Sequence, residues 1–204
     1  MKINKTKSYK FKLVKLNLIK NKTYKKKHNN FIKIEDITNR LKKSLHIIYK
    51  YHINNKKIVF IGTPINIDPK FKKSLQNTKH VLIPKALWMN GIITNQLSCF
   101  KYLSKNQKLI NNKISEILFK IKNKSDLVVI LNTSENLNAL EESYLARIPT
   151  ISINCDLNIT DLKSSYKVPG NFQFRNKKIR DTLFYSILTA VFKKANKNLK
   201  VKDK

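Results

Sequence analysis

Acidic residues, cysteine and glycine are all scarce in this chain of 204 residues. Only 12 Asp and Glu stand against 43 Lys and Arg, so the formal net charge is +31. This charge far exceeds the magnitude of roughly 2–8 that solubility alone requires of a small domain, and an isolated molecule would repel itself unless a polyanion neutralised it. The composition therefore favours a protein that binds nucleic acid.

The small numbers of cysteines and glycines exclude several kinds of site. Cys99 and Cys155 lie far apart, without a CxxC motif or a Cys/His cluster, so we expect neither a disulfide framework nor a metal site. Dinucleotide-binding and phosphate-binding loops need several glycines after the first strand, whereas the whole chain has 3. We interpret Gly62, Gly91 and Gly170 as turn residues at the ends of elements, and we expect no cofactor.

Long apolar runs and catalytic signatures are also missing. No uninterrupted apolar run approaches the ~18 residues of a membrane-spanning helix, so we expect no membrane segment. No GxSxG motif marks a nucleophile, and no histidine pairs by its spacing with Cys or Asp. We interpret Asp126 as a turn or cap residue, Glu141 and Glu142 as a solvated helix face, and Asp156 as a carboxylate without a visible partner. The sequence therefore predicts no catalytic residue and no small-molecule substrate.

The features that are present begin with a basic N-terminal segment. Residues 1–30 are rich in Lys and Asn and contain neither acid nor Arg, and we interpret them as a retained arm that follows RNA rather than as a transit peptide. Over the whole chain 39 Lys stand against 4 Arg. Because Lys acts as a point charge and Arg as a bidentate reader, this ratio favours neutralisation of phosphates over base-specific readout, although AT-rich codons would produce it too.

Short apolar runs alternate with helical periodicity over the rest of the chain. Strands are predicted at 57–64, 80–83, 125–132 and 149–153, with a short fifth at 166–169, and helices at 36–52, 68–77, 96–122, 135–146 and 176–194. Because parallel strands need crossovers, this alternation favours βαβ units. The predicted fold is α/β, with a mainly parallel, flavodoxin-like or Rossmann-like sheet of four to five strands flanked by helices.

The predicted organisation is one domain between two basic ends. The arm covers 1–30, the domain covers 31–195 with a helical segment at about 96–124, and a solvated basic tail covers 196–204. The length of the chain demands no second domain.

Five segments, taken in order, match one pattern of motifs. In the most specific match, at 87–95, Trp88, Gly91, Thr94 and Asn95 keep the spacing of an Arg-Trp-Leu-Gly-Gly-Thr-Leu-Thr-Asn signature. Residues 58–63 match an apolar run that ends in Val-Gly-Thr, and residues 125–130 match a Pro-Asp-Leu-Val-Val strand. Residues 142–149 match a helix that ends in Gly-Ile-Pro, and residues 166–172 match a Tyr-x-Ile-Pro-Gly-Asn-Asp motif. From about 32 to 195 the chain thus resembles the bacterial-type small-subunit ribosomal protein S-two family.

The chain departs from the family's pattern in several places. Leu87 replaces an Arg, Asn90 a Gly and Phe172 an Asp, and Asp156 falls one place late in an Asp-Thr-Asn stretch. The histidine- and tryptophan-bearing N-terminal motif of bacterial members is not recognisable at 20–30, and the helical insertion between Asn95 and Asp126 is shortened. These departures favour a reduced, organellar member, from a mitochondrion or, as the alternative, a plastid.

The resemblance implies a structural constituent of the small ribosomal subunit, on its solvent side near the head–body junction, which binds ribosomal RNA and neighbouring ribosomal proteins. The residues predicted to bind RNA in the arm and around the start of the last helix are Lys25, Lys26, Lys27, Asn171, Arg175, Lys177, Lys178 and Arg180. Asn95 and Trp88 belong to the same predicted set, although a loop tryptophan can fill a core or a protein interface instead of stacking on an unpaired base.

Two other functions are compatible with the composition. An RNA-modifying enzyme with a degenerate cofactor loop, such as a methyltransferase, would need a small-molecule pocket beyond the carboxyl ends of the strands. A DNA-packaging protein would bind duplex DNA away from the ribosome.

Overall fold

The computed structural model describes residues 12–13, 16, 34–64, 67, 69–76, 78–95, 97–99, 101, 117, 119–121, 124–155, 163–170, 172 and 183–202. Their elements, in chain order, are α2 (Ile34–Ile53), β1 (Ile58–Thr63), α3 (Pro69–Leu75), β2 (Val81–Pro84), the 3-10 turn η1 (Lys85–Leu87), β3 (Leu127–Leu131), the 3-10 turn η3 (Thr133–Glu135), α6 (Leu137–Leu145), β4 (Thr150–Ile153), β5 (Tyr166–Val168) and α7 (Leu183–Lys202).

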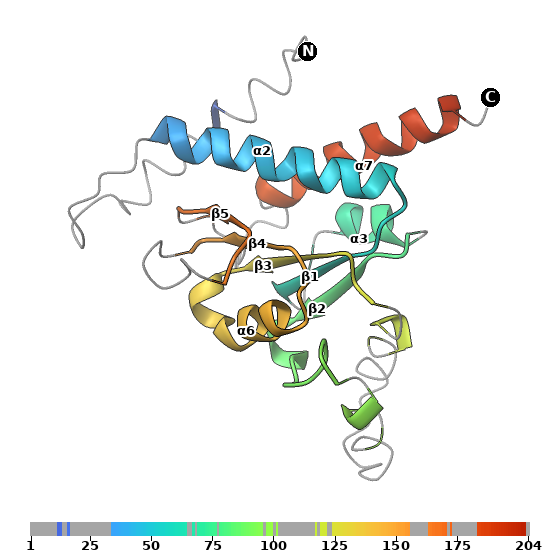
Figure 1. The fold of residues 1–204 in the computed structure, drawn as a ribbon. Coiled ribbons are helices and arrows are strands. Elements are labelled where there is room, and N and C mark those ends of the chain that lie inside the picture. Colours follow the sequence, from blue (N-terminus) through green and yellow to red (C-terminus); the bar gives the residue numbers. More distant parts are fainter. Residues whose placement is uncertain are drawn as a thin grey trace.

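The strands form one five-stranded sheet in the order β2-β1-β3-β4-β5 (Figure 1). Every neighbouring pair is parallel, and the central strand β3 pairs with β1 and β4. All residues of β3 and β4 are buried, as strands covered by helices on both faces must be. The predicted α/β fold with a parallel, flavodoxin-like sheet is confirmed, and the short run at 166–168 is its fifth strand.

Two apolar layers hold the sheet between its helices. On one face α2, α3 and α7 pack over β1 and its neighbours, with Phe60, Phe71 and Phe192 among the buried side chains. On the other face α6 covers the sheet, and Val128 and Leu140 belong to its core (Figure 1). Side chains therefore alternate between two cores along each central strand, as the period of two in a strand requires.

The last helix extends beyond its expected end. The sequence analysis ends it at 194, but α7 continues to Lys202. Ala195 is fully buried, and the Asn198 side chain donates a hydrogen bond to the Tyr49 hydroxyl of α2 at 2.7 Å. The expected end at 194 was wrong. The many Lys and Asn residues there were interpreted as a solvated tail, although apolar residues continue at helical spacing through Ala195. The expected start of this helix, at 176, lies outside the described residues.

The helical segment expected at about 96–122 is described only in part. Residues 97–99, 101, 117 and 119–121 are helical, and the others lie outside the described residues. Within the described part of the chain, no helix is long and apolar enough to cross a membrane.

Candidate nucleic-acid interface

Exposed cations gather on the helices that cover one face of the sheet. The exposed Lys and Arg of α2, α3 and α7 are Arg40, Lys42, Lys43, Lys50, Lys70, Lys72, Lys73, Lys193 and Lys197. We call this set the cationic helical layer. The apolar sides of the same helices pack on the sheet. The amphipathic pattern of each helix thus turns its Lys and Arg outward, where phosphates can reach them.

Most of the residues predicted to bind RNA lie outside the described residues. Lys25, Lys26, Lys27, Asn171, Arg175, Lys177, Lys178 and Arg180 are all in this group. The sequence analysis did not single out the cations of α2 and α3, although their positions between the apolar residues of helical patterns could have identified them. The role of the predicted set stays a prediction.

Trp88 and Asn95 occupy the loop that follows β2. Trp88 is half-buried, packs against the core beneath α6, and donates its Nε1–H to Asn90 Oδ1 at 3.3 Å. Asn95 is exposed, and its Oδ1 accepts a hydrogen bond from the backbone N–H of Ser98 at 3.4 Å. Each side chain therefore has a structural contact within the chain, and binding of RNA by either one stays a prediction.

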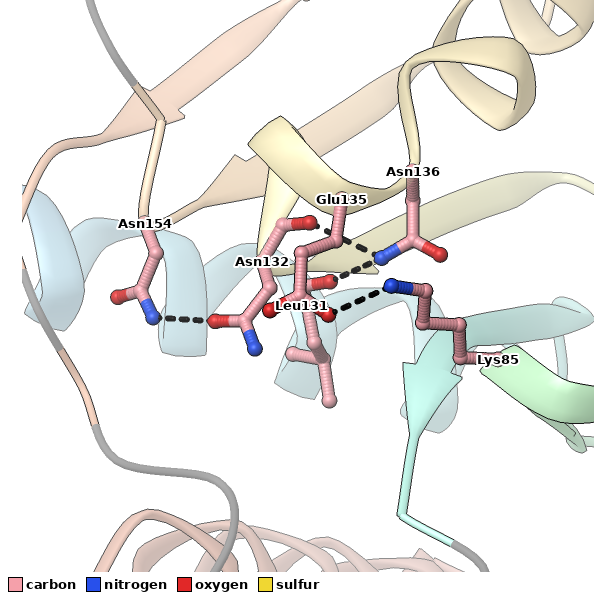
Figure 2. Close-up of polar contacts among 6 residues, drawn as sticks. All are labelled: Lys85, Leu131, Asn132, Glu135, Asn136 and Asn154. Carbon is pink, nitrogen blue, oxygen red and sulfur yellow. Dashed lines mark hydrogen bonds and ion pairs between the residues drawn. The ribbon is translucent and has the colours of Figure 1, made fainter.

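The carboxyl edge of the sheet is where open α/β proteins bind ligands, and here its polar groups bind one another (Figure 2). Asn136 donates from Nδ2 to the carbonyl oxygens of Leu131, at 2.8 Å, and of Asn132, at 2.9 Å. Asn154 donates from Nδ2 to Asn132 Oδ1 at 2.6 Å, and Lys85 forms an ion pair with Glu135 at 3.0 Å. These bonds tie the ends of β2, β3 and β4 together.

Gly62 lies near the carboxyl end of β1, where the strand order reverses between β1 and β3. Its φ is +78°, and a Cβ at this position would lie 2.5 Å from the Leu131 carbonyl oxygen and 2.6 Å from Asn136 Nδ2. In nucleotide-binding relatives of this architecture a phosphate approaches the backbone at this switch point. In this chain the backbone of β3 and the Asn136 side chain occupy that space. Gly62 was predicted to be a turn residue at the end of an element, but it lies inside β1, at a positive φ, where the register with β2 shifts between Ile61 and Thr63.

Asn154 also bonds the backbone of Phe172, a contact that the sequence analysis did not identify. Its Nδ2 donates to the Phe172 carbonyl oxygen at 2.8 Å, and its Oδ1 accepts from the Phe172 N–H at 2.7 Å. Phe172, which stands in place of the family's Asp, is buried, and its ring centroid lies 6.5 Å from that of Phe184. The family's acid is therefore replaced by a core residue at this position.

Glu142 corrects one expectation of the sequence analysis. Glu141 is exposed and forms an ion pair with Lys163 at 2.6 Å, as a solvated face predicts. Glu142, however, is buried and accepts hydrogen bonds from the backbone N–H groups of Gly91 and, at 3.2 Å, Ile93. Consecutive residues on a helix lie about 100° apart around its axis, so Glu141 is exposed to solvent while Glu142 contacts the loop after β2. The interpretation of Glu142 as solvated was wrong.

Replacing Glu142 by Gln should lower the free energy of unfolding by about 1–2 kcal/mol. The Gln amide keeps one acceptor for the two N–H groups, so one charge-assisted hydrogen bond disappears and one donor is left without its partner. Urea unfolding of the two proteins measures the difference. Glu141→Gln is the matched control and should change stability by less than about 0.5 kcal/mol, because its ion pair is exposed. Equal effects of the two substitutions would contradict the assignment.

Asp126 has the turn role that the sequence analysis gives it. Its Oδ2 accepts from the Lys57 backbone N–H at 2.8 Å, and its Oδ1 lies 3.5 Å from Lys56 Nζ. The carboxylate thus joins the start of β1 to the start of β3, and Asp126 is a structural residue.

A pair of buried histidines links three elements on the α2 side of the sheet. His52 Nδ1 lies 2.7 Å from His80 Nε2, and His52 Nε2 lies 2.7 Å from Asn196 Oδ1. The Ile58 backbone N–H donates to His80 Nδ1 at 3.2 Å. Since that N–H can only donate, His80 carries its proton on Nε2 and donates it to His52, which in turn donates from Nε2 to Asn196. The chain of hydrogen bonds therefore has one direction, and both rings are neutral.

Burial is the main reason for the low pKa of His80. Desolvation, and then the neighbouring His52, lowers the pKa of His80 to about 3. The Phe192 ring lies against both imidazoles, with centroid distances of 4.8 Å to His52 and 5.5 Å to His80. The sequence analysis missed this pair because the two residues are far apart in sequence and belong to different elements.

Comparison with known proteins identifies the family of the chain. The model of the family Ribosomal protein S2 matches residues 18–193. The chain is 28% identical over 158 residues to the small ribosomal subunit protein uS2c of Euglena longa, a match that covers 64% of this chain and 65% of the relative. It is 23% identical over 173 residues to the small ribosomal subunit protein uS2 of Rickettsia bellii, with 72% of this chain and 57% of the relative covered. The chain thus spans less than two thirds of the length of either relative. With most of its length inside the family match, the chain belongs to the ribosomal protein S2 family.

Proposed function

We propose that this protein is a structural constituent of the small subunit of an organellar ribosome, where it binds ribosomal RNA and neighbouring ribosomal proteins to support translation. The match of residues 18–193 to the ribosomal protein S2 family carries this proposal. The relatives from Euglena longa and Rickettsia bellii are both named as small ribosomal subunit proteins. Proteins of this family are structural, and this chain is accordingly not an enzyme.

The cationic helical layer supports RNA as the main partner. Its Lys and Arg stand on a rigid α/β core, so they would neutralise phosphates and release counterions from fixed positions. The arm at 1–30, with Lys25, Lys26 and Lys27, and the cations Arg175, Lys177, Lys178 and Arg180 would add to the positive charge that RNA neutralises. The net charge of +31 fits a molecule that is neutralised by the RNA around it.

Lys72→Gln combined with Lys73→Gln should weaken binding to small-subunit ribosomal RNA and reduce its salt dependence. Both residues are exposed on α3 within the cationic helical layer. For each phosphate that is no longer neutralised, the slope of log K against log salt should become shallower by about 0.7–0.9. Filter binding over a range of salt concentrations measures the slope. Lys120→Gln with Lys124→Gln removes the same charge from exposed positions outside the layer, and an equal effect of both pairs would contradict a localised interface.

Sedimentation of organelle lysates tests the proposed role as a whole. The protein is followed by mass spectrometry through gradients at moderate and high salt with magnesium present. We expect it at constant stoichiometry with the small subunit under both conditions, since a structural constituent is held by many interactions. Recovery mainly at the top of the gradient would overturn the proposal. We propose the mitochondrion as the organelle, and parallel gradients of plastid lysate distinguish the alternative.

No observation favours the alternative of an RNA-modifying enzyme. Such an enzyme would hold its cofactor at the carboxyl edge of the sheet, where Gly62, Leu131 and Asn136 are in close contact. Stabilisation of the protein against heat by S-adenosylmethionine would revive that alternative.

A further inference from the structure

Two aromatic rings lie together on the surface of α2, within the cationic helical layer. His46 is exposed, and its ring is stacked on that of Tyr49, with 6.2 Å between the ring centroids and 20° between the ring planes. Tyr49 is half-buried, so His46 is the outer member of the two. We call His46 and Tyr49 the stacking pair.

The last helix holds the inner ring of the stacking pair in place. Asn198 of α7 donates from Nδ2 to the Tyr49 hydroxyl at 2.7 Å, and Lys194 Nζ lies 5.6 Å from the centroid of the Tyr49 ring. Figure 1 shows α7 beside α2. The His46 ring therefore lies against a ring that a second helix already fixes. A flat ligand that stacks on His46 would find the pair ordered in advance, which lowers the entropy cost of binding.

Cations surround His46 on the surface of α2. Residues three and four positions apart are neighbours on a helix. For His46 these positions hold Lys42, Lys43, Tyr49 and Lys50, and all three lysines are exposed. An aromatic ring among cations is the arrangement with which proteins bind unpaired RNA, because the ring stacks on a base while the cations neutralise the phosphates beside it.

The rings of the stacking pair distinguish an unpaired base from a duplex. A duplex keeps its bases stacked on one another and offers a protein mainly phosphates and 2′-hydroxyl groups, for which cations are sufficient. Trp88, which the sequence analysis considered for stacking, packs against the core beneath α6 and donates its Nε1–H to Asn90. The exposed His46 ring is therefore better placed to receive a base than the Trp88 ring.

We propose that the stacking pair binds one unpaired base of the small-subunit ribosomal RNA, stacked on the His46 ring with its flanking phosphates close to Lys43 and Lys50. Tyr49 supports the imidazole from beneath. Every base has a π face, so this contact tolerates any sequence. The inference rests on the proposed function and deepens it, because it assigns a single-stranded segment of RNA to one part of the cationic helical layer.

Replacing the His46 ring tests the proposal. Binding of the full chain is measured to a single-stranded RNA of mixed sequence, and to the same strand paired with its complement, over a range of salt concentrations. His46→Gln should weaken binding of the single strand at least about fivefold, as loss of one base stack does. The slope of log K against log salt should not change, because no Lys is removed. Affinity for the duplex should stay as it is.

Two further variants separate the ring from its other properties. His46→Phe keeps an aromatic ring without the imidazole nitrogens, so it should bind the single strand as the wild type does. Tyr144→Gln removes a ring that is 53% exposed on α6, across the sheet from α2, and should leave binding of both RNAs unchanged. Position 46 is exposed and Gln has a good helix propensity, so the fold should be retained, which urea unfolding verifies.

Unchanged binding of the single strand by His46→Gln would overturn the proposal and would favour a protein neighbour at the stacking pair. A loss that His46→Phe shares, or that extends equally to the duplex, would overturn it as well, because the ring would then not be the cause. Failure of the wild-type chain to bind either RNA would instead overturn RNA binding in the proposed function.

Discussion

Acidification from about pH 7 to about pH 5 should lower the free energy of unfolding by about 2 kcal/mol through His80 alone. The pKa of His80 is about 3 in the folded chain and 6.5 as an isolated group. Because the pKa of His80 is lower in the folded state, the unfolded state binds a proton on His80 more readily. The contribution of His80 to the free energy of unfolding is therefore fully present above pH 6.5 and is lost as the pH falls toward 3. The limiting slope is about 1.4 kcal/mol per pH unit.

The hydrogen bonds also oppose protonation of His80. The chain runs from the Ile58 N–H through His80 and His52 to Asn196 Oδ1. A further proton on His80 Nδ1 would leave two N–H groups facing each other, those of His80 and Ile58, at 3.2 Å. Both imidazoles are buried against Phe192, so water cannot readily solvate the added charge.

Urea unfolding at the two pH values, at constant salt, measures this effect. His80→Asn keeps an acceptor for the Ile58 N–H but cannot titrate, so the pH dependence should be smaller by about 2 kcal/mol while stability at neutral pH falls. His46 is exposed on the same helix as His52, and His46→Gln is the matched control for the removal of an imidazole. An unchanged pH dependence in His80→Asn would rule out His80 as its source.

Gly62→Ala should destabilise the protein by roughly 3 kcal/mol or more, the largest effect expected of a single methyl group in this chain. A non-glycine residue at positive φ costs about 1–2 kcal/mol in itself. The added Cβ would also lie 2.5 Å from the Leu131 carbonyl oxygen, which belongs to the buried strand β3 and cannot easily move. Strain and steric overlap therefore add at this position.

Gly91→Ala separates these two contributions. Gly91 has a φ of +87°, but its nearest neighbour to an added Cβ is the Cys99 sulfur at 3.4 Å, an ordinary contact. This substitution should cost only the backbone strain, about 1–2 kcal/mol. Removing the Asn136 side chain should not rescue Gly62→Ala, because the Leu131 oxygen remains. Urea unfolding measures the loss of stability in Gly62→Ala, in Gly91→Ala, and in Gly62→Ala without the Asn136 side chain. Equal losses in Gly62→Ala and Gly91→Ala would show that crowding at β3 is unimportant.

The periodicity of apolar residues was sufficient to predict the sheet and most of its helices. The runs at 57–64 and 125–132 are rich in β-branched residues and bounded by turn signals, so strands buried on both faces were the simplest interpretation. Their order with intervening helices was enough to predict parallel pairing. Strands and helices of this kind can be predicted because the apolar and turn residues that determine them are close together in sequence.

The interactions that were missed all join residues distant in sequence. Glu142 resembles a solvated helix residue until the loop at Gly91 and Ile93 is brought beside it. His52 and Asn196 are separated by 144 positions, and no spacing rule connects them. Composition was misleading as well, since the Lys and Asn residues beyond 194 concealed a helix that packs on α2. Tertiary packing overrides local appearance at such positions.

The packing of α7 on α2 also sets the order in which the chain can complete its fold during synthesis. Helix α2 cannot complete its packing until α7 has been made, because Tyr49 and Asn198 are 149 positions apart and Phe192 enters the core formed by Phe60 and Phe71. Until then the apolar sides of α2 and α3 remain uncovered on a nascent chain with a large positive charge. Pairings of such long range are slow to form, and the unfinished chain is prone to aggregate. This protein should therefore depend on a chaperone, or on polyanions that bind during translation, until α7 has been released.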